Sequence, residues 1–177
     1  AHEPRTATPR GELVIDRGFA RDYLNWRLRD AVADALKDSD LLLACCRLLK
    51  LDLVCVPVDC KEAQTDILSP PAEDIAKFVD EGLFVFWLVD GVFQLALAER
   101  GMMALMMAVG QSPDDLGKDL QQRSQTVMAA MSRGGGAGAH GVIIADDIAY
   151  GRGTYMAPAF VERHLLPVWK AQVAAAH

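Results

Sequence analysis

Four short apolar runs, each ending in an aspartate, constrain the fold of this chain more than any other feature. They span residues 11–16, 52–59, 83–90 and 141–147. Their apolar residues are continuous rather than alternating with polar ones, so strands formed from them must be covered on both faces. Segments with helical spacing lie between the runs. We therefore expect an α/β fold in which parallel strands are joined by helical crossovers.

The intervening segments predict six helices. They cover residues 19–36, 41–49, about 71–82, 91–109, 113–133 and a last helix from about 158, interrupted at Pro167. Ser112 and Pro113, followed by two acids, are typical of a helix start. The methionines of the fourth helix recur at helical spacing, and we expect them in the core. Glycines after residue 133 end the fifth helix.

Length and composition indicate one domain over residues 1–177. Of the 177 residues, 51% are hydrophobic and 24% are charged, which is enough to bury a core without disulfides. The net charge of −6 argues against a nucleic-acid partner or an anionic membrane. The apolar stretches are shorter than the ~20 residues that span a bilayer, and no secretory signal is recognisable. We expect a cytoplasmic protein with no nucleic-acid or membrane partner.

The four cysteines fit a reducing compartment. Cys45 and Cys46 are adjacent in an apolar helical segment and are predicted to be buried. Cys55 and Cys60 flank the end of the second strand, but form neither a C-x-x-C pair nor zinc-finger spacing. A metal or thiol role for these two residues is left open, and no metal site is predicted.

The recurring aspartates are the first candidate site. In a parallel sheet, all strand ends of one kind meet at the same edge, where such folds place their sites. The aspartates concerned are Asp16, Asp59, Asp90, Asp146 and Asp147. Each of them could simply start a loop or cap a helix. Several together favour a ligand with N–H donors or positive charge, or a metal ion.

The segment after the fourth strand is the second candidate. It reads ADDIAYGRGTY over residues 145–155 and contains Tyr150 and Arg152. Glycines on both sides of Arg152 let the backbone bend and present the guanidinium, which suits a carboxylate or phosphate. The alternative is an ion pair between Arg152 and Asp147 that only braces the loop.

A literal G-x-G-x-x-G occurs at residues 136–141. A dinucleotide-binding fingerprint must follow a strand and open a helix. This one follows a helix and opens a strand, so a Rossmann fold is not predicted.

Residues 138–168 resemble the uroporphyrinogen decarboxylase superfamily, chiefly in the segment ADDIAYGRGTYMAP. That superfamily includes the decarboxylase and corrinoid-linked methyltransferases on the same (β/α)8 barrel. The runs GELVID, DLVCVPVD and LFVFWLVDGVFQ look like its first three strands. The resemblance implies a half-barrel of about four βα units with parallel strands.

The resemblance also implies chemistry. Asp59 matches the aspartate that stabilises the protonated pyrrole formed during decarboxylation, and is the implied catalytic residue. Arg152 would hold a substrate carboxylate, and the other substrate-binding candidates are Asp16, Asp90, Asp146, Asp147 and Tyr150. The chain departs from the family because it lacks the arginine-rich R-x-x-G-R-Y motif. It also has Met128-Ala129-Ala130-Met131 where the family has a tyrosine.

These features predict a decarboxylase-like subunit that acts on or binds a tetrapyrrole-type ligand. The alternatives are a corrinoid-dependent methyltransferase component, with corrinoid as its cofactor, and a non-catalytic tetrapyrrole-binding or assembly subunit. A complete doubly wound sheet is the alternative architecture. Exposing ~1,000 Å² of an open half-barrel would forfeit ~25 kcal/mol. We therefore expect a homodimer or a second chain that supplies the missing half.

Overall fold

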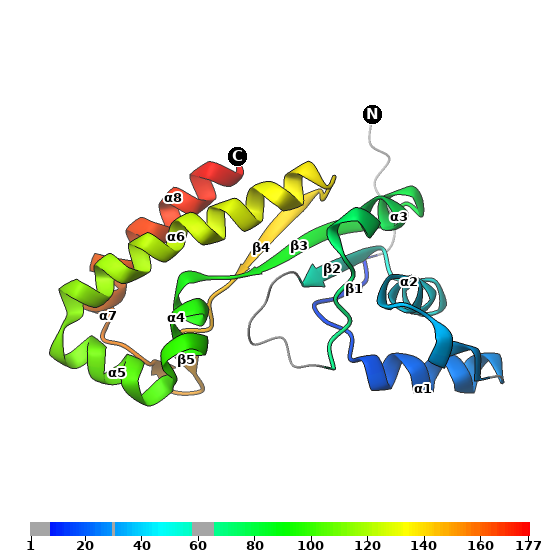
Figure 1. Cartoon of the computed structure of the whole chain (residues 1–177), viewed down its shortest axis with the longest axis horizontal. Coiled ribbons are helices and arrows are strands. Elements are labelled where there is room, and N and C mark those ends of the chain that lie inside the picture. Colours follow the sequence, from blue (N-terminus) through cyan, green and yellow to red (C-terminus); the bar gives the residue numbers. More distant parts are fainter. Residues whose placement is uncertain (1–7, 30, 58–65) are drawn as a thin grey trace. The chain divides into compact units, whose positions relative to one another are not determined.

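The computed structural model describes residues 8–29, 31–57 and 66–177 (Figure 1). These residues form two compact units. The first holds residues up to 87 together with 135–141, and the second holds residues 88–134 and 142–177.

Four strands form one parallel sheet in the order β1-β2-β3-β4. They are β1 (Gly11–Glu12), β2 (Leu53–Pro57), β3 (Phe84–Asp90) and β4 (Gly141–Ala145). In the register of β1 with β2, Gly11 lies opposite Leu53. The predicted α/β class with parallel strands is therefore confirmed.

The first strand is shorter than predicted. It ends at Glu12, and the side chains of Leu13 and Val14 are exposed. Asp16 instead forms an isolated antiparallel bridge with Ile67. The apolar run over residues 11–16 is therefore longer than β1, the strand that pairs with β2.

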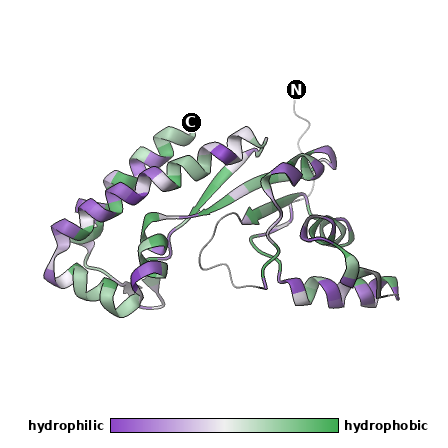
Figure 2. Ribbon diagram, in the orientation of Figure 1, coloured by the Kyte–Doolittle hydropathy of each residue, from purple (hydrophilic) through white to green (hydrophobic). Residues whose placement is uncertain are grey.

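Burial is uneven across the sheet. The central strands are hydrophobic and mostly buried, and Trp87 of β3 is fully buried (Figure 2). All five residues of β4 are only half-buried. Because β4 ends the strand order, no strand covers its outer edge within the described part of the chain.

Five helical segments belong to the first unit. They are α1 (Arg17–Leu28), η1 (Ala31–Ala35), α2 (Asp38–Leu49), η2 (Ala72–Asp74) and α3 (Ile75–Asp80). The single helix predicted over residues 19–36 is wrong, because α1 ends at Leu28 and Arg29 adopts a left-handed conformation with φ of 55°. Arg17 and Asp38 link α1 to α2 through a two-pronged ion pair, with nitrogen–oxygen distances of 3.1 and 2.6 Å.

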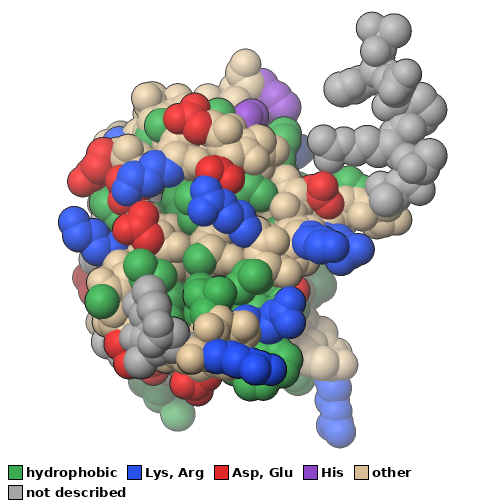
Figure 3. All heavy atoms as spheres, turned by 90° about the vertical axis from the view of Figure 1, so that its right-hand side faces the viewer, with side chains coloured by type: hydrophobic (Ala, Val, Ile, Leu, Met, Phe, Trp, Pro, Cys, Tyr) green, Lys and Arg blue, Asp and Glu red, His purple; other side chains and the backbone are tan. Residues whose placement is uncertain are grey.

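The apolar residues of α1 do not all face the core. Its buried residues are Ala20 and Leu24, whereas Phe19 and Trp26 are exposed. The ring of Tyr23 lies 5.7 Å from that of Phe19 and 6.1 Å from that of Trp26. Figure 3 shows other hydrophobic side chains exposed among Lys and Arg side chains on one face of the molecule.

Cys45 and Cys46 of α2 are buried, as predicted. Burial raises the pKa of Cys45 to about 11 and that of Cys46 to about 12. Both thiols therefore stay protonated at neutral pH and act as small apolar side chains.

Helices α4 (Val92–Arg100), α5 (Met102–Gln111) and α6 (Pro113–Gly136) lie in or extend from the second unit. The predicted single helix over 91–109 is wrong, since Gly101 has a φ of 76° and the chain bends there by 112°.

No single helix among the described residues is long and apolar enough to cross a membrane, although α4 and α5 together meet the length and composition test. The core position expected for the methionines is also wrong, because Met103 is 78% exposed and Leu105 fills the buried position.

The C-terminal segment begins with a feature the sequence did not predict. A two-stranded antiparallel hairpin, β5 (Ala149–Tyr150) with β6 (Gly153–Thr154), follows β4. The chain continues through α7 (Pro158–Phe160), a π-helical turn η3 (Val161–Leu165) and α8 (Leu166–Ala176). The predicted interruption at Pro167 thus takes the form of a widened turn just before the proline, which has no N–H to donate.

Candidate functional site

The carboxyl ends of β3 and β4 meet in the second unit. Asp90 ends β3, and Asp146 and Asp147 follow β4. The backbone N–H of Gly91 donates to the carbonyl of Ala145 at 2.7 Å, which joins the two strand ends. Asp90 is close enough to Asp146 for its charge to raise the pKa of that carboxyl. Two of the predicted edge carboxylates therefore lie together, and we call these strand ends with the β5–β6 hairpin the carboxyl-edge site.

Asp146 is the most constrained residue of this site. Its Oδ1 accepts the backbone N–H groups of Phe93 at 2.9 Å and Gln94 at 3.1 Å. Its Oδ2 accepts the indole N–H of Trp169 in α8 at 2.7 Å. The two backbone donors belong to the first turn of α4, where N–H groups have no partner inside the helix. Asp146 thus caps α4 from another strand and ties it to α8.

Gly91 makes this cap possible. It occupies the capping position of α4 and has no side chain to supply the missing acceptor. A Cβ atom at this position would lie 2.1 Å from the Cγ of Asp146. Glycine therefore leaves the space into which the Asp146 carboxylate fits.

The pKa of Asp146 is raised above its ordinary value. Burial is the largest cause, and the nearby Asp90 charge adds to it. The hydrogen bonds from Trp169, Gln94 and Phe93 act in the opposite direction, because they favour the charged form. Since three donors engage this carboxylate, its role in the site is to position α4 and α8.

Arg152 lies at the turn of the hairpin, between Gly151 and Gly153. Gly153 has a φ of 147°, which side-chain-bearing residues rarely adopt. Within the described residues, the Arg152 side chain makes no ion pair or hydrogen bond. The alternative in which Asp147 only braces Arg152 is therefore not what the structure forms. Asp147 makes one long contact, from the N–H of Ala149 at 3.4 Å.

An aromatic stack supports the hairpin, and sequence reasoning missed it. The ring of Tyr155 lies 5.6 Å from the ring of Tyr150 and 6.4 Å from that of Phe93, nearly parallel to both. The hairpin is closed by the N–H of Tyr155, which donates to the carbonyl of Ile148 at 2.9 Å. Tyr150 is 55% exposed, so the outer ring of the stack has a free face. The spacing of tyrosines around a glycine turn was the available signal for this stack.

Asp16 lies in the first unit and has a structural partner. Its side chain accepts the N–H of Phe19 at 2.7 Å and caps α1. Asp59, the implied catalytic residue, and Cys60 lie outside the described residues. Cys55 is buried in β2, and burial raises the pKa of its thiol.

The described residues contain no group of three or more His, Cys, Asp and Glu side chains placed to hold a metal ion. The residues of the carboxyl-edge site better fit an organic ligand. An unpaired guanidinium can bind a carboxylate in a bidentate manner, and an exposed tyrosine face can stack on a planar ring.

Comparison with known proteins adds no relative. No family model matches the chain, and no curated protein or solved structure is significantly similar to it.

Proposed function

We propose that this chain is a uroporphyrinogen decarboxylase-like half-barrel that binds a tetrapyrrole-type ligand at the carboxyl ends of its strands. The observation that carries the proposal is Arg152, which has no partner among the described residues and lies at the turn of the hairpin that follows β4. Tyr150 of the same hairpin is exposed, so the hairpin carries both a carboxylate-binding group and an aromatic ring.

The strand order supports the barrel-type architecture. Doubly wound sheets reverse their strand order at a switch point, whereas a barrel adds each strand next to the previous one. The order here is β1-β2-β3-β4, without a reversal. Four successive parallel strands are what the first half of such a barrel would contain.

The outer edge of β4 supports a partner that completes the barrel. Val142, Ile143 and Ile144 are half-buried, and none of them carries a charge that would discourage strand pairing. A second copy of the chain, or another chain with the remaining strands, would cover this edge. We favour the homodimer.

The ligand can be tested by absorbance titration of the purified protein. We expect uroporphyrin to bind with a shift of its Soret band. Arg152→Gln should weaken this binding about tenfold, the value of one hydrogen-bonded charge contact. Lys170→Gln removes one positive charge from an exposed position of α8 and is the matched control. The absence of a saturable Soret shift, or equal affinity of the Arg152→Gln and wild-type proteins, would contradict the proposal.

The same experiment separates the alternative functions. Hydroxocobalamin in place of the porphyrin tests a corrinoid-dependent methyltransferase component. Release of carbon dioxide from uroporphyrinogen tests decarboxylation, in which Asp59→Asn should abolish turnover without unfolding the protein. Binding without turnover would identify a tetrapyrrole-binding or assembly subunit.

A further inference from the structure

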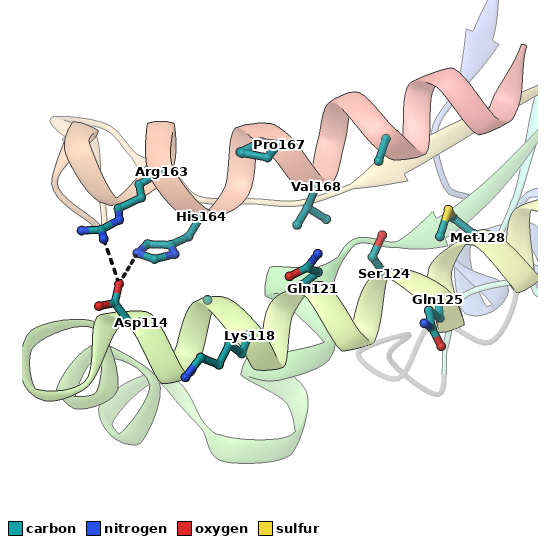
Figure 4. Close-up of a pocket in the computed structure, with 12 residues that line it drawn as sticks. Asp114, Lys118, Gln121, Ser124, Gln125, Met128, Arg163, His164, Pro167 and Val168 are labelled. Atoms are coloured by element: carbon teal, nitrogen blue, oxygen red, sulfur yellow. Dashed lines mark ion pairs between the residues drawn. The ribbon is translucent and has the colours of Figure 1, made fainter.

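A groove of about 630 Å³ separates α6 from η3 and α8 in the second unit (Figure 4). It is distinct from the carboxyl-edge site, since none of the residues that line it belongs to the strand ends or the hairpin. This volume is within the range of small-molecule sites. We call it the α6–α8 groove.

The groove exists because the facing side chains of α6 are small or polar. Residues spaced by three and four positions point to one face of a helix. On the groove face of α6, this series is Asp114, Gly117, Gln121, Ser124 and Met128. Two helices normally close the space between them with apolar side chains at such positions. Here Met128 is the one long apolar side chain of the series, so the space between α6 and α8 is not filled.

Ser124 marks the groove as a place for a ligand. Ser124 is 5% exposed, and its hydroxyl has no hydrogen-bond partner in the part of the chain that the structure describes. The hydroxyl lines the groove, where Figure 4 shows it pointing toward α8. A buried hydroxyl without a partner is unfavourable, and a ligand atom in the groove would relieve this.

Three basic side chains line the mouth of the groove. Arg163 and His164 lie on η3, and Lys118, which forms an ion pair with Asp115 at 3.1 Å, lies one turn into α6. Among the described residues, Asp114 is the one acid that lines the groove, and its Oδ1 forms ion pairs at 3.6 Å with nitrogens of both Arg163 and His164. These distances exceed those of hydrogen bonds, and Arg163 is 72% exposed. The guanidinium can therefore exchange Asp114 for an incoming anion.

The widened turn fixes the position of His164. The imidazole packs against Phe160, with ring centres 4.7 Å apart. On the other side it lies directly over Gly117, where a Cβ atom would be 2.2 Å from Nδ1. Such π-turns occur often at functional sites. Val168, which is 6% exposed, follows one turn later and supplies an apolar wall deeper in the groove.

We propose that the α6–α8 groove binds a small organic anion, with a carboxylate or phosphate at Arg163 and His164 and an uncharged body that reaches Ser124 and Val168. The head is held by charge at the mouth. The body gains apolar contact and one hydrogen bond to the Ser124 hydroxyl. This proposal does not depend on the tetrapyrrole function.

Phenyl phosphate is a suitable probe, because it combines an anionic head with an apolar body. Its affinity can be measured by isothermal titration calorimetry. Inorganic phosphate tests the head alone, and benzyl alcohol tests the body alone. We expect phenyl phosphate to bind in the millimolar range or better. It should bind at least about tenfold more tightly than inorganic phosphate or benzyl alcohol, a difference that corresponds to ~1.4 kcal/mol. Phenylacetate in a parallel titration distinguishes a carboxylate head from a phosphate head.

Variants assign the binding to the groove. Arg163→Gln should weaken phenyl phosphate about tenfold. Ser124→Ala should weaken 4-hydroxyphenyl phosphate severalfold, because this probe has a ring hydroxyl, absent from phenyl phosphate, that can bond to the Ser124 hydroxyl. Ser124→Ala should leave the thermal unfolding temperature unchanged or higher, because it removes a hydroxyl without a partner. Lys170→Gln, on α8 and outside the groove, is the control for charge.

Three results would overturn the proposal. The first is the absence of saturable phenyl phosphate binding. The second is unchanged affinity of Arg163→Gln for phenyl phosphate, or of Ser124→Ala for 4-hydroxyphenyl phosphate. The third is loss of binding in Arg152→Gln with full binding in Arg163→Gln, which would assign the anion to the carboxyl-edge site. Uroporphyrin binding by Arg163→Gln is measured in parallel, so that failure of one proposal is distinguishable from failure of the other.

Discussion

The carboxylate of Asp146 accepts the indole N–H of Trp169 at 2.7 Å, while its other oxygen accepts two N–H groups from the first turn of α4. One side chain thus links the end of β4 to two helices that are distant from it in sequence. Because the two oxygens have different donors, substitutions can separate their contributions.

Asp146→Asn should destabilise the protein by ~1–3 kcal/mol, since it leaves a buried donor unpaired. The amide oxygen of asparagine can still accept the N–H groups of α4, but its NH₂ would face the indole N–H of Trp169. Adding Trp169→Phe removes that conflict, so the two substitutions together should cost less than the sum of each alone. Urea unfolding of the four proteins measures this coupling. Purely additive effects would show that the 2.7 Å contact contributes nothing.

The pKa of Asp146 gives a second, independent prediction. Burial and the Asp90 charge raise it above the unfolded value. The folded state therefore binds a proton more readily than the unfolded state, and the contribution of Asp146 to stability falls as the pH rises through the folded pKa. The contribution is fully present below the unfolded pKa.

This dependence is measured as the unfolding free energy of wild type minus that of Asp146→Asn across the acidic range. We expect the difference to decrease with rising pH and then level off. A difference that increases with pH would mean that the three donors outweigh burial and that the pKa is lowered.

Gly91→Ala should destabilise the protein by ~1–3 kcal/mol, because the added Cβ collides with the Asp146 carboxylate. Gly110→Ala is the matched control. It places the same methyl group in α5, where nothing lies within 4 Å. This control should be stabilising by ~0.5–1 kcal/mol, as expected for alanine in a helix. Equal effects of the two substitutions would refute the close approach at Gly91.

Asp38 should show the opposite pH dependence from Asp146. Burial acts to raise its pKa, but the hydrogen bonds and charge of Arg17 and the N–H of Ser69 outweigh burial and lower it. Its contribution to stability is therefore present above the unfolded pKa and is lost as the pH falls through the folded pKa. Asp38→Asn should cost ~1–2 kcal/mol at neutral pH. We expect that cost to shrink in urea unfolding as the pH falls below the ordinary pKa of an aspartate, and a constant cost across the acidic range would contradict the ion pair.

Assembly can be tested by sedimentation equilibrium at micromolar concentration. If a second copy covers the edge of β4, the wild-type chain should sediment as a dimer rather than as the 19.3 kDa monomer. Ile143→Lys places a charge on this edge and should favour the monomer. A stable, well-folded monomer of the wild type would contradict the homodimer and favour a complete doubly wound sheet.

The sequence alone determined the fold class and the positions of three main strands. A strand made of a continuous apolar run must be covered by other elements on both faces. This requirement can be read from each run by itself, without knowing the rest of the fold. The start of α6 at Pro113 was predictable for the same reason, because capping depends on adjacent residues. The carboxyl edge formed by Asp90, Asp146 and Asp147 followed from parallel strand direction.

Only the tertiary structure decided what these residues do. The donors to Asp146 lie 23 to 53 residues away along the chain, so no local pattern encodes them. The break at Gly101 was invisible, because a glycine inside an apolar helical pattern is compatible with both a straight helix and a turn. The Arg152 guanidinium has no partner within the described residues, and this fact, like the groove beside Ser124, depends on which side chains of other elements come close. An unpaired side chain or an open groove results from how the elements pack against one another. The order of residues within one element does not specify that packing.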